Sequence, residues 1–186
     1  MFSKRGFTLV EILFVVLIAA GALVLALPSY KGMRERGKFQ AASGRLLDLG
    51  NAVESVTSDL AMKGESIQIG SSNAYEYTGS SDAMSSKKTL KEELGTLTGA
   101  AREQKVLKLL IPAGYLKDFQ GSTGFKYYVL RNAAATGALA PCKDTGGTVI
   151  ACMLKTGTLD SKDCFAGARY YKGGRMQTIR MSNCKD

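Results

Sequence analysis

The N-terminal part of the chain carries one long apolar run. Residues 12–27 (ILFVVLIAAGALVLAL) include no charged or strongly polar side chain, and the whole run, 7–27, contains a single charge, Glu11. As a helix this run spans about 30 Å, one hydrocarbon thickness of a bilayer. The pattern therefore predicts a transmembrane helix over 7–28. The carboxylate needs an explanation, because a charge of this kind in lipid costs about 2.5–3.5 kcal/mol.

Beyond Pro28 the apolar positions continue at helical spacing but follow one side only. They recur at alternating steps of three and four residues: Phe39, Ala42, Leu46, Leu49, Val53, Val56 and Leu60. This stripe predicts an amphipathic half, 29–64, of the same long helix, ended by Gly64. A seam this narrow is typical of a coiled coil or of a helix covered by a sheet. The strand signals near the C-terminus favour the sheet.

The next segment, 65–123, predicts a variable connection between the helix and the sheet. Its first part, 70–88 (GSSNAYEYTGSSDAMSSKK), is rich in Ser, Gly and Asn and is typical of an exposed loop. Leucines 90, 94 and 97 indicate a short helical piece, and residues 100–111 indicate a longer helix that Pro112 stops.

Strand signals dominate the last segment, 124–186. Four runs are rich in aromatic and β-branched residues, with turn residues at 144–147 and 172–174 between them: 125–131, 148–154, 168–172 and 175–181. They predict an antiparallel sheet of about four strands that covers the helix stripe. The predicted fold class is α+β, with a long N-terminal helix whose first half spans a membrane and whose second half packs on the sheet.

Enzyme chemistry has little support in the sequence. Histidine is absent from the 186 residues, which removes Ser-His and Cys-His nucleophile pairs and every zinc site that needs histidine. No Gly-rich phosphate loop and no Gly-x-Ser-x-Gly motif is present. We therefore expect no catalytic activity, no cofactor and no metal site.

The first residues carry a motif. "KRG" followed by "FTLVE" and a long apolar helix resembles the leader and N-terminal helix of type IV pilins and of type II secretion pseudopilins. The resemblance covers residues 1 to about 60, and Pro28 also matches; beyond that it is one of layout only. It implies that residues 1–6 are a leader, that a prepilin peptidase cuts between Gly6 and Phe7, and that the same enzyme methylates the new amine of Phe7.

The resemblance also implies a role for Glu11. In a fibre the apolar helices leave lipid and pack together, where an unpaired carboxylate is costly. The Phe7 amine of a neighbouring copy would neutralise Glu11, and this assembly salt bridge would set the axial register, since sliding the helices leaves two buried charges unmatched. The alternative is that Glu11, about 6 Å from the new terminus, faces lipid headgroups and has no role.

Gly21 and Pro28 both weaken a helix, the first through backbone entropy and the second through a missing donor and a steric clash. One interpretation is that the stretch between them melts when subunits stack, and the other is a mere kink. The stretch 19–21 also matches a small-residue cleavage site, which would make the run a conventional signal peptide.

All four cysteines lie in the last quarter of the chain, and none forms a Cys-x-x-Cys pair. An even number in an exported domain predicts two disulfides, and four cysteines allow three connectivities. We favour Cys142 with Cys152 across the turn at 144–147, and Cys164 with Cys184 at the C-terminal end.

Positive charge gathers at the sheet end, because residues 117–186 hold 11 basic and 5 acidic residues, against 12 and 11 in residues 7–116. Basic residues of the predicted strands and turns interleave with tyrosines: Lys126, Arg131, Arg169, Lys172, Arg175 and Arg180. This composition can hold a polyanion such as DNA. A basic sheet face is more often simply solvated.

Three functional hypotheses follow from the resemblance. The first is a structural subunit of a type IV pilus, a homo-oligomeric fibre for adhesion, twitching motility or DNA uptake. The second is a pseudopilin of a type II secretion system, and the third is a minor pilin that binds DNA or a surface. Each implies the prepilin peptidase and an inner-membrane assembly platform as partners. Each also implies a precursor in the bacterial inner membrane, with the assembled subunit in an extracellular pilus or a periplasmic pseudopilus.

Overall fold

A computed structural model gives the structure of the protein. It describes residues 8–79, 82–85, 88–122, 124–142, 148–155, 165–170 and 176–180. Within these ranges some residues are described by their backbone alone: 23–29, 31, 32, 35, 132, 138, 141, 148, 149, 155, 165–170 and 176–180. The chain divides into two compact units, Met1–Gln40 and Ala41–Asp186, and each is described by itself.

Helix α1 runs from Leu9 to Met62 without interruption, and it contributes to both units. Its end is set by the chain beyond Met62, where Gly64 N–H donates to Ala61 O and Glu65 N–H donates to Leu60 O. This pair of bonds satisfies carbonyls that the last turn leaves without partners. The predicted stop at Gly64 is confirmed.

The crossing of a membrane by the first half of this helix stays a prediction. Within the ranges described, no helix combines the length and the apolar character that a crossing needs.

The second half of α1 carries the buried stripe that the sequence predicts. Six of the seven predicted positions have no exposed surface: Ala42, Leu46, Leu49, Val53, Val56 and Leu60. They recur every three or four residues, so one face of the helix packs against the sheet. An ion pair of 3.3 Å between Glu54 of α1 and Arg131, just after β2, ties the two layers together.

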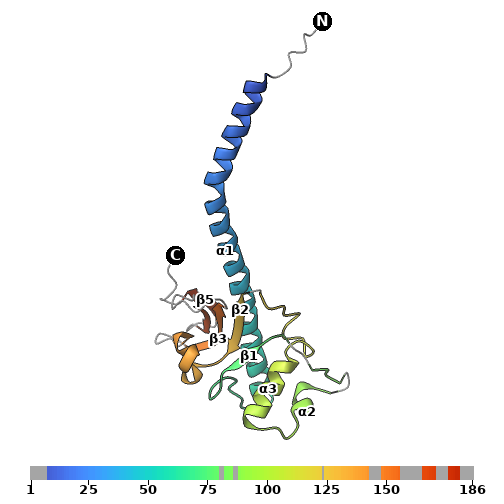
Figure 1. Cartoon of the computed structure of the whole chain (residues 1–186). Coiled ribbons are helices and arrows are strands. Elements are labelled where there is room, and N and C mark those ends of the chain that lie inside the picture. Colours follow the sequence, from blue (N-terminus) through green and yellow to red (C-terminus); the bar gives the residue numbers. More distant parts are fainter. Residues whose placement is uncertain are drawn as a thin grey trace. The chain divides into compact units, whose positions relative to one another are not determined.

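The sheet has five antiparallel strands in the order β1-β2-β3-β4-β5 (Figure 1). Their bounds are Tyr75–Tyr77, Phe125–Val129, Thr148–Lys155, Phe165–Tyr170 and Met176–Arg180. Every strand pairs with its neighbour in the chain, so the sheet is a simple meander. The four predicted strands overlap β2–β5, although β4 begins at Phe165, before the predicted start at residue 168.

Strand β1 corrects the sequence prediction, which placed 70–88 in an exposed loop. Its three residues alternate buried, exposed and buried, with Tyr75 and Tyr77 facing the core. Phe119 packs edge-on against Tyr77 on one side and Tyr127 of β2 on the other, at centroid distances of 4.8 and 5.0 Å. Three aromatic rings therefore anchor a strand too short to be stable alone.

The connection between α1 and β2 also contains two helices, α2 (Leu90–Leu94) and α3 (Gly99–Leu109). Thr89 begins α2 with a capping box, because Glu92 N–H donates to the Thr89 hydroxyl and the Glu92 carboxylate accepts from Thr89 N–H. Glu65, just past α1, holds both helices through ion pairs with Lys91 at 3.2 Å and Arg102 at 2.6 Å.

Gly70 joins three parts of the second unit. Its N–H donates to the buried carboxylate of Glu103 on α3 at 2.8 Å, and its C=O accepts from Arg131 N–H at 2.7 Å. A Cβ atom at this position would lie 2.7 Å from Leu130 Cα. Only glycine fits this close approach of two backbones.

Two short 3₁₀ helices follow β2, namely η1 (Asn132–Ala134) and η2 (Gly137–Cys142). The last residue of η2, Cys142, forms a disulfide with Cys152 of β3. Both cysteines are fully buried in a small cluster with Leu130. The first favoured disulfide is therefore present, whereas Cys164 and Cys184 lie outside the residues that the structure describes.

Candidate functional site

The start of α1 is built around Thr8 and Glu11. Thr8 donates to the Glu11 carboxylate twice, from its N–H at 2.8 Å and from its hydroxyl at 2.9 Å. In return Glu11 N–H donates to the Thr8 hydroxyl at 3.3 Å. This reciprocal arrangement is a capping box, which satisfies donors that the first turn of a helix leaves unpaired. In a single copy of the chain, Glu11 therefore serves its own helix.

Apolar side chains surround the helix axis after this cap. Nine of them are between 55% and 80% exposed in the single chain: Leu9, Val10, Ile12, Leu13, Phe14, Val15, Val16, Leu17 and Ile18. Isolated exposed apolar residues are common, but a continuous surface of this kind marks a site of association. We call these nine residues the apolar sleeve.

The remaining residues predicted in this part of the chain are placed only partly. Gly6 and Phe7 lie outside the described residues. Helical backbone continues through Gly21 and Pro28, and a Cβ at Gly21 would meet nothing within 4 Å. The melting of this stretch stays a prediction.

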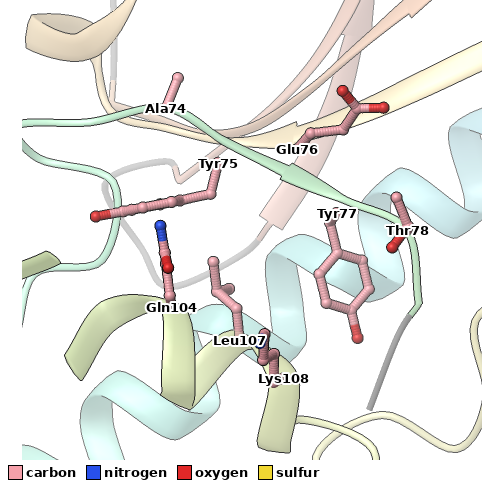
Figure 2. A pocket seen from close by; sticks show the side chains of 8 residues that line it. All are labelled: Ala74, Tyr75, Glu76, Tyr77, Thr78, Gln104, Leu107 and Lys108. Carbon is pink, nitrogen blue, oxygen red and sulfur yellow. The ribbon is translucent and has the colours of Figure 1, made fainter. Parts of the chain in front are cut away.

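A second candidate site is a pocket of about 310 Å³ between β1 and α3. Residues 74–78 of the strand region line one side, and Gln104, Leu107 and Lys108 of α3 line the other. Figure 2 shows the tyrosine rings of β1 on the side that faces α3, with Glu76 pointing away from it. Sequence reasoning missed this pocket because it treated the strand region as a loop.

The charges at the pocket are unequal. Glu76 makes an ion pair of 3.1 Å with Lys126 on β2, whose pKa is raised by the hydrogen bond to Glu76. Lys108 has no ion-pair partner among the residues described. Its neighbour Lys105 forms an ion pair of 2.8 Å with Asp82, and the charge of Lys108 also lowers the pKa of Asp82. Two lysines therefore share one carboxylate. The α3 side of the pocket is therefore left with positive charge.

The predicted polyanion face is only partly described. Lys126 and Arg131 each pair with a carboxylate, Glu76 and Glu54, which reduces the charge they offer to a polyanion. Arg169 and Arg180 are placed by backbone alone in β4 and β5. Lys172 and Arg175 lie outside the described ranges, so the polyanion face stays a prediction.

Metal ligands do not gather in the described part of the chain, where no group of three or more Cys, Asp or Glu side chains could hold an ion. Comparisons of the chain with protein-family models, with curated proteins and with solved structures find no match.

Proposed function

We propose that this chain is a structural subunit of a type IV pilus, which polymerises through the first half of α1. The observation that carries the proposal is the apolar sleeve on a helix capped by Thr8 and Glu11. In a fibre outside the membrane, leaving such side chains in water would cost about 1.5–3 kcal/mol for each large one, so the fibre has to bury the nine against one another. Copies of the same sleeve, packed side by side, would form the core of a fibre.

The proposal includes the processing implied by the sequence motif. Cleavage between Gly6 and Phe7 would leave a free amine two residues before the helix, and the Thr8–Glu11 cap would remain intact because Thr8 keeps its amide. In the fibre, the amine of one copy would approach Glu11 of the next. Glu11 would thus exchange donors from its own chain for a charged donor from its neighbour, which is the stronger contact.

Before assembly, the proposal places the precursor in the bacterial inner membrane, with the sleeve among lipids and residues after Pro28 outside the cytoplasm. This membrane location of the precursor is supported by the apolar run 7–27 of the sequence. Extraction of the native host's membranes tests it: the chain should resist sodium carbonate and dissolve in detergent. Release by carbonate alone would contradict an embedded precursor.

The fibre is tested by replacing Glu11. Glu11→Ala and Glu11→Gln should both reduce sheared surface fibres at least tenfold, measured by immunoblot and electron microscopy. The second capping box of the chain supplies a matched control, because Thr89 and Glu92 make the same bonds at the start of α2. Glu92→Ala should retain fibres. Normal fibre yield with Glu11→Ala would overturn the assembly role of Glu11.

Mass spectrometry of the native chain tests its identity as a pilin. A methylated Phe7 at the N-terminus is expected, and an intact Met1 would overturn the proposal. The location of the polymer separates the pilus from a secretion pseudopilus, since a pilus subunit appears in surface fibres and a pseudopilin stays in the periplasm.

A further inference from the structure

We propose that the outer edge of β1 is a binding site for an extended peptide that carries an apolar side chain and a carboxylate two residues apart. The peptide would add a sixth strand to the sheet and fill the pocket between β1 and α3. This site lies in the second unit and is independent of the fibre proposal.

The first argument is the direction of the backbone groups of β1. Leu130 N–H donates to Ile150 O of β3, and Arg131 N–H donates to Gly70 O on the opposite side. Because backbone groups alternate along a strand, Val129 and Tyr127 must use theirs toward β1. Their partners Tyr75 and Tyr77 therefore bond to β2, and Glu76 directs its N–H and C=O away from the sheet.

The N–H and C=O of Glu76 therefore lie at the outer edge of the sheet. Strand β1 is the first in the sheet order and pairs with β2 alone. No hydrogen bond to the main chain of Glu76 occurs within the part of the chain that the structure describes. An unpaired strand edge is a template on which another extended segment can pair.

The second argument is the pocket beside this edge. In an added strand, the residue opposite Glu76 points to the same face as Glu76, and the residues before and after it point to the face of Tyr75 and Tyr77. That face borders the pocket of about 310 Å³, whose floor includes Leu107. The space suits an apolar side chain.

The third argument is charge. In Figure 2, Gln104 lies toward the Tyr75 end of the pocket and Lys108 toward the Tyr77 end. Glu76 is already paired with Lys126, and Lys105 and Lys108 share the one carboxylate of Asp82, so the site keeps a net positive charge at Lys108. A carboxylate on the incoming strand, two residues from the apolar side chain, complements Lys108. These three arguments together favour an acidic extended peptide over a basic one.

Binding is tested with the full chain in mild detergent and two fluorescent probes, acetyl-Thr-Val-Thr-Asp-Thr-amide and acetyl-Thr-Asp-Thr-Val-Thr-amide, which present the two side chains in either strand direction. One of them should bind measurably by fluorescence anisotropy. Lys108→Glu should weaken binding at least tenfold, whereas Lys117→Glu, an exposed lysine away from the pocket, should not. No binding by either probe at millimolar concentration would overturn the proposal.

Strand addition also predicts a pattern along the probe. N-methylation removes an amide donor, so it should abolish binding at one set of alternate residues and be tolerated at the other set. Equal effects at both sets would overturn the mode. Hydrogen–deuterium exchange should slow at Glu76 when the probe is added. If exchange there slows with protein concentration alone, a second copy occupies the edge and the assignment to an acidic partner is wrong.

Discussion

Two buried tyrosine hydroxyls in the aromatic cluster have opposite environments. The Tyr77 hydroxyl is buried with no hydrogen-bond partner among the described residues, and burial raises the pKa of Tyr77 to about 12. The Tyr127 hydroxyl donates to the Ser122 hydroxyl at 3.0 Å. The Tyr77 hydroxyl loses its hydrogen bonds to water on folding and gains no described partner, whereas the Tyr127 hydroxyl gains a hydrogen bond to Ser122.

We therefore expect Tyr77→Phe to raise the free energy of unfolding by about 1 kcal/mol, because it removes an unsatisfied buried group. Tyr127→Phe, the matched control, should lower it by about 1 kcal/mol, because it leaves Ser122 with one partner fewer. Urea unfolding followed by circular dichroism measures both. A loss of stability with Tyr77→Phe equal to that of Tyr127→Phe would show that the Tyr77 hydroxyl has a partner in solution.

Gly70 gives a second prediction at the residue scale. Its φ is +77°, and an added Cβ would lie 2.7 Å from Leu130 Cα. Gly70→Ala should lower the free energy of unfolding by more than about 2 kcal/mol, because backbone strain and a clash add together. Gly114→Ala is the control: its φ is +81°, but a Cβ there would meet nothing within 4 Å. This change should cost about 1–2 kcal/mol through strain alone. Equal losses would exclude the clash.

At the scale of elements, the disulfide joins η2 to β3 within the buried cluster around Leu130. Replacing both Cys142 and Cys152 by Ala should lower the free energy of unfolding by about 2–4 kcal/mol, since the unfolded chain regains the entropy of an open loop. Urea unfolding of this double variant measures the loss. An unchanged midpoint would mean that the buried cluster around Leu130 holds η2 in place without the bond.

Element prediction from sequence succeeds where a pattern is long. The stripe from Ala42 to Leu60 repeats over several turns, so its period is unambiguous, and all six of these positions are buried. Strand β1 is missed because its alternation spans three residues inside a Ser- and Gly-rich stretch. Its stability comes from Phe119 and Tyr127, which are distant in sequence, and no local pattern encodes that contact.

The two candidate sites also differ in whether the local sequence encodes them. Thr8 and Glu11 have the spacing of a capping box, which is a local signal, but the sequence prediction assigned Glu11 only to a neighbouring copy or to lipid headgroups and missed the cap. The pocket was not readable from the sequence, because it depends on α3 meeting β1. The spacing of Gln104, Leu107 and Lys108 shows that they share a helix face, yet nothing in it says which element that face meets.

At the scale of the whole molecule, acid should loosen the second unit. The Arg102 and Lys91 hydrogen bonds hold the pKa of Glu65 below its usual 4.5, and the Lys63 and Tyr115 hydrogen bonds hold the pKa of Asp59 below its usual 3.8. A carboxylate whose pKa is lower in the folded state stabilises the fold above its unfolded pKa, and this stabilisation disappears as the pH falls through the folded value. The free energy of unfolding should therefore change little near pH 7 and decrease once the pH is lowered past about 4.5.

Glu65→Gln tests which contact is responsible. The variant should have a lower urea midpoint than the natural chain at pH 7, and the difference should shrink as the pH is lowered toward 3, because protonation of Glu65 weakens its ion pairs in the natural chain. Asp118→Asn, which removes a carboxylate without an ion pair among the described residues, should change the midpoint little at either pH. A constant difference between pH 7 and pH 3 for Glu65→Gln would mean that its ion pairs with Lys91 and Arg102 do not stabilise the fold.

The junction at Gly70 has a consequence for how such a chain can diversify. Its two hydrogen bonds use the main chain of Gly70 and require only a carboxylate at 103 and a peptide N–H at 131. Exposed side chains elsewhere in the connection can change without breaking these two hydrogen bonds, whereas the neighbouring Ile69 is buried in the core. A lineage that keeps the glycine could therefore exchange the surface of 71–123 for new recognition properties while the helix and the sheet remain joined as before.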